Sequence, residues 1–348
     1  MQMFQIFSKI FGCDVQISDD FVKDDAGQKS VRRHFIKFCC DRQKLNSPWV
    51  AARLSGQMGK LILRDIKCLM KKEPDGAKKQ QYFDTMAWIR KKAIDHPKMV
   101  EKYAKIIAKS LKNSSKIKSL EVQFKQIYQD VRIAAILHDI GRLSEIDVAH
   151  GVVCNKPSAK RPHHADIGYE ILKGACIKPE IALAVKHHRF ANTDELLKDE
   201  DYQNLAQTEQ KRAVLYALII QDADKLANID ERAQNGVMKS SEYSDSLYQK
   251  DYDISDDFFA KAMAGEYTKA PYHHMLDVMV HYVTWGYEAH FDVSKKILKG
   301  LMPALFERFE EEAQREYMSD KEPDEQRFKK TISDIEQLKE FAITQKAK

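Results

Sequence analysis

The sequence predicts an almost entirely α-helical protein, for three reasons. Glycine (13 residues) and proline (9 residues) are scarce in this chain of 348 residues, so residues that interrupt helices are rare. Alternating Val/Ile/Thr patterns, which are typical of strands, are hard to find. Apolar residues instead recur at helical spacing, as in the stripe formed by Met99, Tyr103, Ile106, Ile107 and Leu111.

Helices and polar loops alternate along the first part of the chain. Helical spacing is present before residue 80, with polar loops expected at 19–29 and 71–79. A strongly apolar segment, Val131–Leu137, predicts a helix that leads directly into His138.

The later part of the chain continues the helical pattern. Helices are expected at about 165–173, 179–187, 208–226, 277–291 and 306–317. We therefore expect an N-terminal helical region (1–80), a core (81–230) and a C-terminal helical region that packs on the core (231–348).

Composition and charge narrow the class of protein. Lysine and arginine exceed aspartate and glutamate by 57 − 52 = +5, which is too weak at this size to indicate nucleic-acid binding. The basic clusters at 90–92 and 102–118 are interpreted as solvated helix faces, with a phosphate-attracting surface as the alternative. The six cysteines show no C-x-x-C spacing, which favours reduced thiols in a cytoplasmic protein.

Two further patterns concern the membrane and other subunits. No apolar run reaches the roughly 20 residues of a membrane-spanning helix, so no membrane partner is expected. The apolar segment Met1–Phe11 is short and lacks a cleavage site of small residues. We expect it to pack on the core or on another subunit, which leaves a homo-oligomer open.

Five short motifs contain the residues expected to carry chemistry. They are Asp95-His96-Pro97, Leu137–Arg142, His163–Gly168, Lys186–Arg189 and Asp222–Leu226. Neutral imidazoles and carboxylates are the ligands of borderline divalent metals such as Mn²⁺, Fe²⁺, Co²⁺, Ni²⁺ and Zn²⁺. Such an ion polarises a phosphate oxygen and lowers the pKa of a bound water.

The pair His138-Asp139 is at the centre of this pattern. Adjacent side chains diverge by about 100° on a helix, but at a helix end they can approach one ion from two sides. Gly141 suits such a helix end. Apolar residues precede both His138 and Asp222, so these polar groups are expected to be buried and to need partners. Each motif alone can be a surface or backbone-bonded group; the joint pattern favours a metal site.

In this combination the motifs resemble those of the HD superfamily of metal-dependent phosphohydrolases. The family pattern is an early histidine, a His-Asp pair and a late aspartate, which matches His96, His138, Asp139 and Asp224. The late family motif often reads Ala-Asp, a basic residue and Leu, so the resemblance gives the ligand role to Asp224 rather than Asp222. It implies an all-α HD-domain helical bundle with additional N- and C-terminal helices.

Family members with two metals add a histidine four residues before a glycine, followed by a His-His pair. His164 and Gly168 have that spacing, and His187-His188 follows. The resemblance therefore implies two divalent ions, with His164 and at least one of His187 and His188 on the second, and with Asp139 as a bridge.

Two substrates known in the family fit this sequence less well. Cyclic-dinucleotide phosphodiesterases carry a Gly-Tyr-Pro signature after the His-Asp pair, and none is present here. The ppGpp hydrolases have a late motif similar to 223–228 but lack the second-metal histidines.

The resemblance implies a phosphomonoesterase or phosphodiesterase that uses a metal-activated water on a nucleotide or a similar small phosphate ester. Asp139 would act together with Arg142 and Lys225, two candidate cations for phosphoryl charge, for which surface ion pairs are the alternative. His150 and His163 are candidates for proton transfer. Two other functions stay open, a di-iron oxygenase and a non-catalytic metal- or nucleotide-binding module.

Overall fold

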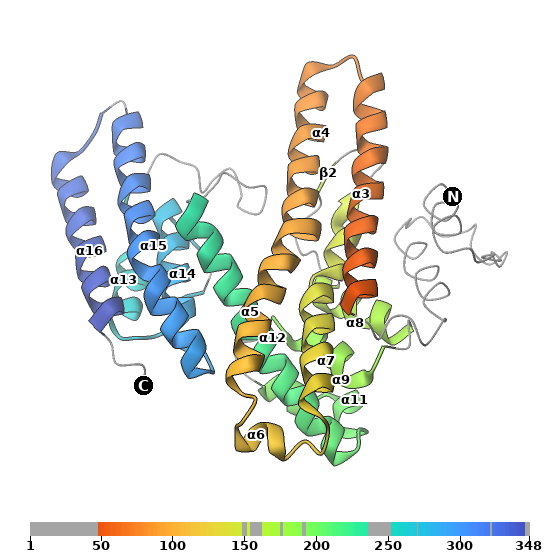
Figure 1. Ribbon diagram of the computed structural model, residues 1–348. Coiled ribbons are helices and arrows are strands. Elements are labelled where there is room, and N and C mark those ends of the chain that lie inside the picture. Colours follow the sequence, from red (N-terminus) through yellow and green to blue (C-terminus); the bar gives the residue numbers. More distant parts are fainter. Residues whose placement is uncertain are drawn as a thin grey trace. The chain divides into compact units, whose positions relative to one another are not determined.

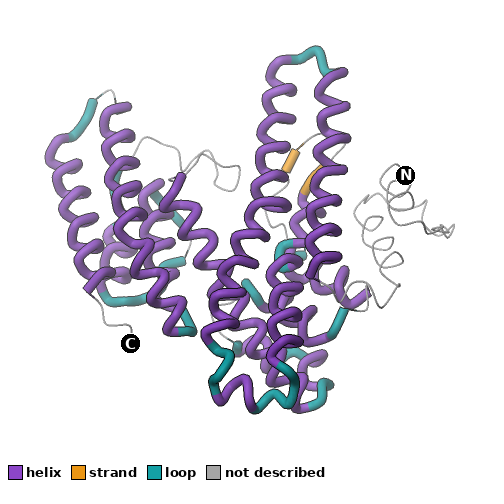
Figure 2. The backbone as a smooth tube through the Cα atoms, in the orientation of Figure 1, coloured by secondary structure: helices purple, strands orange, loops and turns teal. Residues whose placement is uncertain are grey.

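The protein is almost entirely helical, as the sequence predicts (Figures 1 and 2). A computed structural model describes residues 48–147, 152–153, 162–174, 177–189, 193–235, 252–269, 271–320 and 322–344. Within these residues the only strands are β1 (Ile146–Asp147) and β2 (Val152–Val153), which pair antiparallel. None of the described helices is both long and apolar enough to cross a membrane. The segment Met1–Phe11 and His150 lie outside the described residues.

The chain divides into two compact units, with the boundary between Gln221 and Asp222. The helices of the first unit are α3 (Pro48–Lys72), α4 (Gly76–Ile89), η2 (Arg90–Asp95), α5 (His96–Ser110), α6 (Ser115–Lys118), α7 (Phe124–Leu137), η3 (Ile140–Glu145), α8 (His164–Gly174), α9 (Pro179–His187), α10 (Asp194–Leu197), α11 (Glu200–Gln203) and the first part of α12 (Gln207–Asn235). The second unit contains the end of α12, α13 (Asp256–Met263), α14 (Met275–Trp285), η5 (Gly286–Glu288), α15 (Asp292–Ser319) and α16 (Glu325–Thr344). The three regions expected from the sequence stay a prediction.

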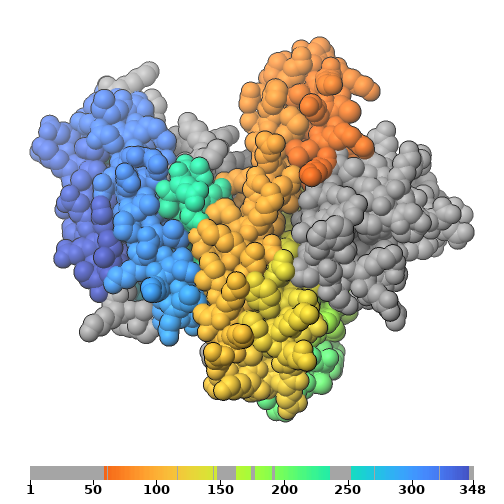
Figure 3. All heavy atoms as spheres, viewed as in Figure 1, coloured from red at the N-terminus to blue at the C-terminus, as the bar shows by residue number. Residues whose placement is uncertain are grey.

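The apolar helix α7 lies at the centre of the first unit. It packs against α3, α5 and α9, and Ile127, Val131 and Ala134 are fully buried along it. Burial on several sides requires apolar residues around most of the helix, which explains the apolar run in the sequence. The chain that leaves α7 after Leu137 therefore enters the interior of the unit. In the space-filling view, α4, α5 and α7 (orange to yellow) form much of the visible surface of this unit (Figure 3).

The helices α4 and α5 are joined without a loop by the π-helical segment η2. A π-helical turn adds a residue to a helix, and each residue rotates the following side chains by about 100°. The segment therefore sets the direction in which His96, the first residue of α5, leaves the helix. Pro97 occupies the first turn of α5, where its missing N–H costs no hydrogen bond. His96 is buried.

In the second unit, a buried carboxylate links the starts of α13 and α14. Asp277 accepts hydrogen bonds from the backbone N–H groups of His273 and His274 at 2.9 and 3.0 Å, immediately before α14. It also accepts one from the backbone N–H of Ser255 at 2.9 Å, the residue before α13. The first N–H groups of a helix lack partners inside the helix, so a carboxylate at this place is stabilising.

Candidate metal centre

His138 and Asp139 form the turn that follows α7, and both side chains are buried. The Nδ1 atom of His138 lies 2.8 Å from the backbone oxygen of Ala135, three residues earlier. The last carbonyl groups of a helix have no partner within it, and here the imidazole satisfies one of them. A proton on Nδ1 leaves the lone pair on Nε2, the atom that a metal would bind.

His96 lies against His138 from the start of α5. The Nε2 atoms of the two imidazoles are 3.3 Å apart. Two ligand atoms that share an ion at about 2.1 Å are themselves about 3.0–3.4 Å apart in octahedral or tetrahedral geometry. Asp139 completes this first group, because its Oδ2 atom lies 3.6 Å from Nε2 of His138. One ligand atom from each of the three residues lies within 4.8 Å of the others.

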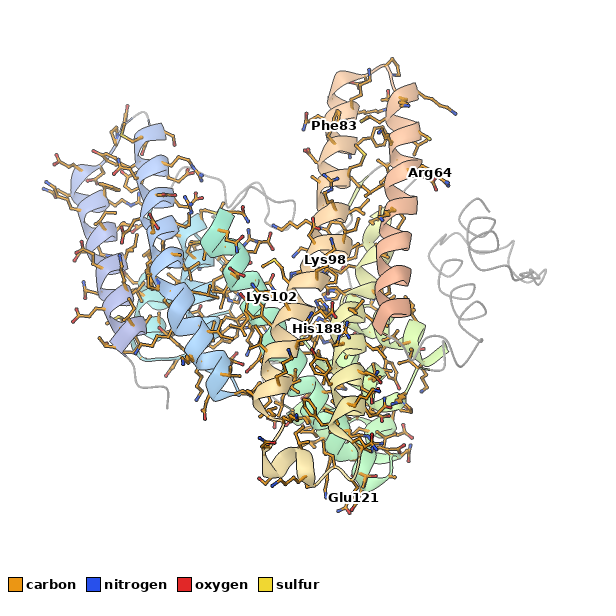
Figure 4. The ribbon with its side chains drawn as sticks, in the orientation of Figure 1. Arg64, Phe83, Lys98, Lys102, Glu121 and His188 are labelled. Carbon is orange, nitrogen blue, oxygen red and sulfur yellow. The ribbon has the colours of Figure 1, made fainter. Side chains whose placement is uncertain are left out.

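A second group of three contains Asp139 again, with His164 and His188. Nε2 of His164 lies 3.2 Å from Oδ1 of Asp139, and Nε2 of His188 lies 3.7 Å from the same oxygen. His188 follows α9 and repeats the arrangement of His138, since its Nδ1 atom lies 2.6 Å from the backbone oxygen of Val185. Figure 4 shows His188 in the interior of the first unit.

Asp139 is therefore shared by the two groups, with one carboxylate oxygen for each. Its Oδ1 atom and Nε2 of His164 are buried, and neither has a hydrogen-bond partner among the described residues. Buried polar atoms are almost always hydrogen-bonded, so two such atoms 3.2 Å apart need another partner. The donor set, the spacing and the absent hydrogen bonds fit divalent metal ions.

Asp139 is kept in its charged form by its neighbours. Burial raises the pKa of the carboxyl group, but the Arg142 guanidinium and the imidazoles of His138 and His164 outweigh this effect and hold the pKa well below its usual range. Nε of Arg142 donates to Oδ2 of Asp139 at 2.7 Å. The carboxylate is thus available as a ligand without first losing a proton.

Gly141 allows η3 and α8 to approach each other closely. A Cβ atom at this position would lie 2.0 Å from the backbone oxygen of His164 and 2.7 Å from the backbone nitrogen of Gly168. Among the described glycines only Gly265 has a positive φ angle, so a left-handed backbone conformation is not the reason for glycine at position 141. The reason is the close contact that brings His164 to Asp139.

The comparison with known families agrees with this geometry. The family model described as the HD domain matches residues 93–229. This part of the chain is an HD domain. No curated protein and no solved structure matches the chain. The HD domain spans all five motifs found in the sequence, from His96 to Asp224.

Within the HD domain, the adjacent residues His187 and His188 have different surroundings. Nε2 of His187 lies 2.8 Å from Oδ2 of Asp199, and Nζ of Lys186 lies 2.7 Å from the same oxygen. His187 is absent from the metal-like groups of the described residues, whereas His188 is present. Asp199 has no motif around it in the sequence, and its role is visible only in the structure.

The late motif of the HD domain lies on α12, where Asp222, Asp224 and Lys225 belong to the second unit. Both carboxylate oxygens of Asp222 accept backbone N–H groups of residues 290 and 291 at 3.0–3.1 Å, just before α15. Asp224 is half-buried and accepts a hydrogen bond from the side chain of Asn228 at 2.8 Å. Asp222 therefore has a structural role, which favours Asp224 as the ligand.

The two predicted catalytic cations have different surroundings in the HD domain. Arg142 contacts Asp139, as described above. Lys225 is buried, and its Nζ atom donates to the backbone oxygen of Glu288 at 3.2 Å and lies 3.6 Å from the carboxylate of the same residue. Burial lowers the pKa of Lys225 against the opposing effect of Glu288. The phosphoryl-binding role of both cations stays a prediction.

His163 begins the turn that leads into α8. Its Nδ1 atom accepts the backbone N–H of Ala165 at 3.2 Å, and its ring centroid lies 4.0 Å from that of His164. Burial and the charges of His164 and Arg189 lower the pKa of His163 to about 2. The side chain is neutral at ordinary pH, and its role in proton transfer stays a prediction.

Glu145, the last residue of η3, lies beside the candidate ligands but belongs to none of the five sequence motifs. Its Oε1 atom lies 3.5 Å from Nδ1 of His164, and its side chain is buried. Nothing in the sequence around Glu145 distinguishes it from the other acidic residues. Glu145 lies six residues after Asp139. This spacing indicates a shared helix face only once the intervening segment is known to be a 3₁₀ helix.

Proposed function

We propose that the HD domain is a hydrolase of a small phosphate ester, a nucleotide or a related molecule, and that it uses two divalent transition metal ions. One observation carries this proposal. The two oxygens of Asp139 lie next to two different sets of imidazole nitrogens, at 3.6 Å on one side and 3.2 Å on the other. A carboxylate between two ligand sets is the arrangement that two-metal phosphoryl-transfer sites use.

The proposed ligands come from helix ends and from one internal helix. The first ion would be held by His96, His138, Asp139 and Asp224, and the second by Asp139, His164 and His188. The assignment of Asp224 as a ligand rests on its motif and on the family match, which extends to residue 229. His187 is left out because Asp199 engages its Nε2 atom.

Two bound ions supply a water of lowered pKa and stabilise the attacking and leaving oxygens of phosphoryl transfer. The residues of the chain prepare this chemistry. Arg142 keeps Asp139 ionised, and Nδ1 of His138 and of His188 is taken by a backbone oxygen, which leaves Nε2 for the ion. The imidazoles of the four proposed histidine ligands, His96, His138, His164 and His188, are buried, so that few water molecules compete for the site.

The first experiment measures metal content and hydrolysis in the purified full-length chain. Bound metals are counted by mass spectrometry in the wild type, in Asp139→Asn and in Glu180→Gln. Glu180 is a matched control because it is a buried carboxylate paired with an arginine, Arg212, at 3.0 Å, outside the metal-like groups. Hydrolysis of an aryl phosphate monoester, an aryl phosphate diester and a nucleotide panel is followed with added Mn²⁺, Co²⁺ or Ni²⁺.

We expect close to two ions per chain in the wild type and in Glu180→Gln, and loss of both metal and turnover in Asp139→Asn. A wild type that binds no metal and hydrolyses nothing would sink the proposal and favour a binding module. Two irons, consumption of O₂ and no hydrolysis would instead indicate an oxygenase.

A further inference from the structure

Four side chains around the second ligand set form a closed ring. Arg142 Nε donates to Asp139 Oδ2 at 2.7 Å, and Asp139 Oδ1 lies 3.2 Å from His164 Nε2. On the other side of the ring, His164 Nδ1 lies 3.5 Å from Glu145 Oε1, and Glu145 Oε2 lies 3.6 Å from Arg142 Nη1. Two carboxylates thus alternate with a guanidinium and an imidazole.

The ring follows from the helix type of η3. Asp139 precedes this 3₁₀ helix, and Arg142 and Glu145 lie three and six residues later. The backbone N–H of Arg142 donates to the backbone oxygen of Asp139 at 2.9 Å, which is the i→i+3 hydrogen bond of a 3₁₀ helix. Side chains three residues apart eclipse each other in this helix, whereas an α-helix would rotate each by about 60°. The three charged side chains therefore lie along one face.

The position of His164 explains why a carboxylate is needed here. His138 and His188 follow the ends of α7 and α9, so the unpaired carbonyls at those ends can accept from Nδ1. His164, in contrast, is the first residue of α8, so its side chain lies at the start of a helix rather than after its end. Glu145 occupies the corresponding place beside Nδ1 of His164.

The described residues offer Glu145 no hydrogen bond that would explain its burial. Its Oε2 atom is buried and has no hydrogen-bond partner among them. A buried carboxylate is costly unless it is paired, and the ring provides the only cation close to it, Arg142, among the described residues. A solvated surface carboxylate would not have this environment.

We propose that Glu145 and Arg142 are positioning residues for the second metal ion. Glu145 holds Nδ1 of His164 so that Nε2 faces Asp139, and Arg142 anchors the two carboxylates of the ring. The inference rests on the proposed function and adds Glu145 as a residue that controls occupancy of one ion rather than of both, whereas Arg142 also contacts the oxygen of Asp139 that faces the first group. Outer partners of ligating histidines change metal affinity by about 10–100-fold in proteins generally.

The first test titrates metal-free full-length protein with Zn²⁺ by calorimetry. Wild type is compared with Glu145→Gln and with the control Glu180→Gln. The two variants carry the same chemical change at two buried glutamates that each lie near an arginine. We expect Glu145→Gln to bind the second ion about 10–100-fold more weakly and the first ion as before. Two unchanged affinities in Glu145→Gln would overturn the inference and leave the proposed function standing. A wild type that binds no ion would overturn the proposed function itself.

The second test reads the proton of His164 directly and does not depend on metal. Nitrogen-15 NMR of the metal-free protein distinguishes an imidazole protonated on Nδ1 from one protonated on Nε2, and the spectrum of His164→Gln assigns the signal. We expect the proton on Nδ1 in the wild type and a shift toward Nε2 in Glu145→Ala. A wild-type proton on Nε2 would overturn the inference even if the Glu145 variants fail to fold.

Discussion

Gly141 lies so close to His164 that a Cβ atom on the glycine would be 2.0 Å from the backbone oxygen of the histidine. Gly141→Ala is therefore expected to push α8 away from η3 and to lower stability by roughly 3 kcal/mol. Urea unfolding measures this loss. Gly300→Ala is the control, since a Cβ there meets nothing within 4 Å, and it should stabilise α15 by up to about 1 kcal/mol. Equal unfolding midpoints for Gly141→Ala and wild type would contradict the close contact.

The neighbours His187 and His188 are expected to respond differently to the same substitution. His188→Ala removes an imidazole whose Nε2 lies near Asp139 and should abolish binding of one ion. His187→Ala breaks the contact with Asp199 and should cost about 1–3 kcal/mol of stability while both ions remain bound. Metal counting and thermal unfolding of the two variants separate these effects. Loss of metal in His187→Ala with full retention in His188→Ala would reverse the assignment.

A second pair of neighbours, Asp222 and Asp224, allows a similar comparison. Asp222→Ala leaves the N–H groups before α15 without their acceptor and should destabilise the chain by about 3 kcal/mol. Asp224→Ala removes the contact with Asn228, should cost about 1 kcal/mol of stability, and should also cause loss of metal. Calorimetric unfolding beside metal analysis checks both. An Asp224→Ala protein with its full metal content would remove Asp224 from the ligand set.

His281 is expected to make the second unit sensitive to acid. Burial lowers the pKa of this imidazole to about 4, although Nδ1 donates to the backbone oxygen of Thr268 at 2.8 Å. The rings around it are those of Tyr267, Tyr272, Tyr282 and Trp285. The pKa of this histidine in the unfolded chain is about 6.5. Between about pH 4 and pH 6.5 the unfolded chain therefore binds a proton that the folded chain does not bind. Stability should therefore fall as the pH drops from about 6.5 to about 4 and level off below.

The matched variant for this effect is His281→Gln, which keeps a donor for Thr268 and does not titrate in this range. Wild type should lose about 2–3 kcal/mol more than the variant between pH 7 and pH 4. Urea midpoints at both pH values measure the difference. Parallel pH profiles for the two proteins would show that His281 is accessible to protons in the folded state.

The helical fold was predictable because its signals are local. Scarce glycine and proline and apolar residues at helical spacing predict helices, and α9 begins and ends at the residues expected, Pro179 and His187. The π-helical segment η2 and the 3₁₀ helix η3 were not predicted. Their hydrogen bonds differ from those of an α-helix by one residue, and no pattern of residue types specifies that difference.

The candidate metal centre was predictable as a set of motifs but not in its details. The motifs named His96, His138, Asp139, His164 and His188 as ligands, and these residues fall into two of the three metal-like groups of the described residues. The choice between His187 and His188 depends on which side of the end of α9 faces the interior. Adjacent residues differ by about 100° in direction, and only tertiary packing decides between them.

The two histidines that bind backbone oxygens with Nδ1, His138 and His188, have a consequence for loading and unloading of metal. Their rings are held by carbonyl groups of their own chain, at 2.8 and 2.6 Å, so the proposed ligands would be in place before an ion arrives. Small zinc modules, in contrast, fold only when the metal binds. In the proposed site an ion would meet ligands already held in position, and chelation should leave a folded domain that takes up metal again without refolding.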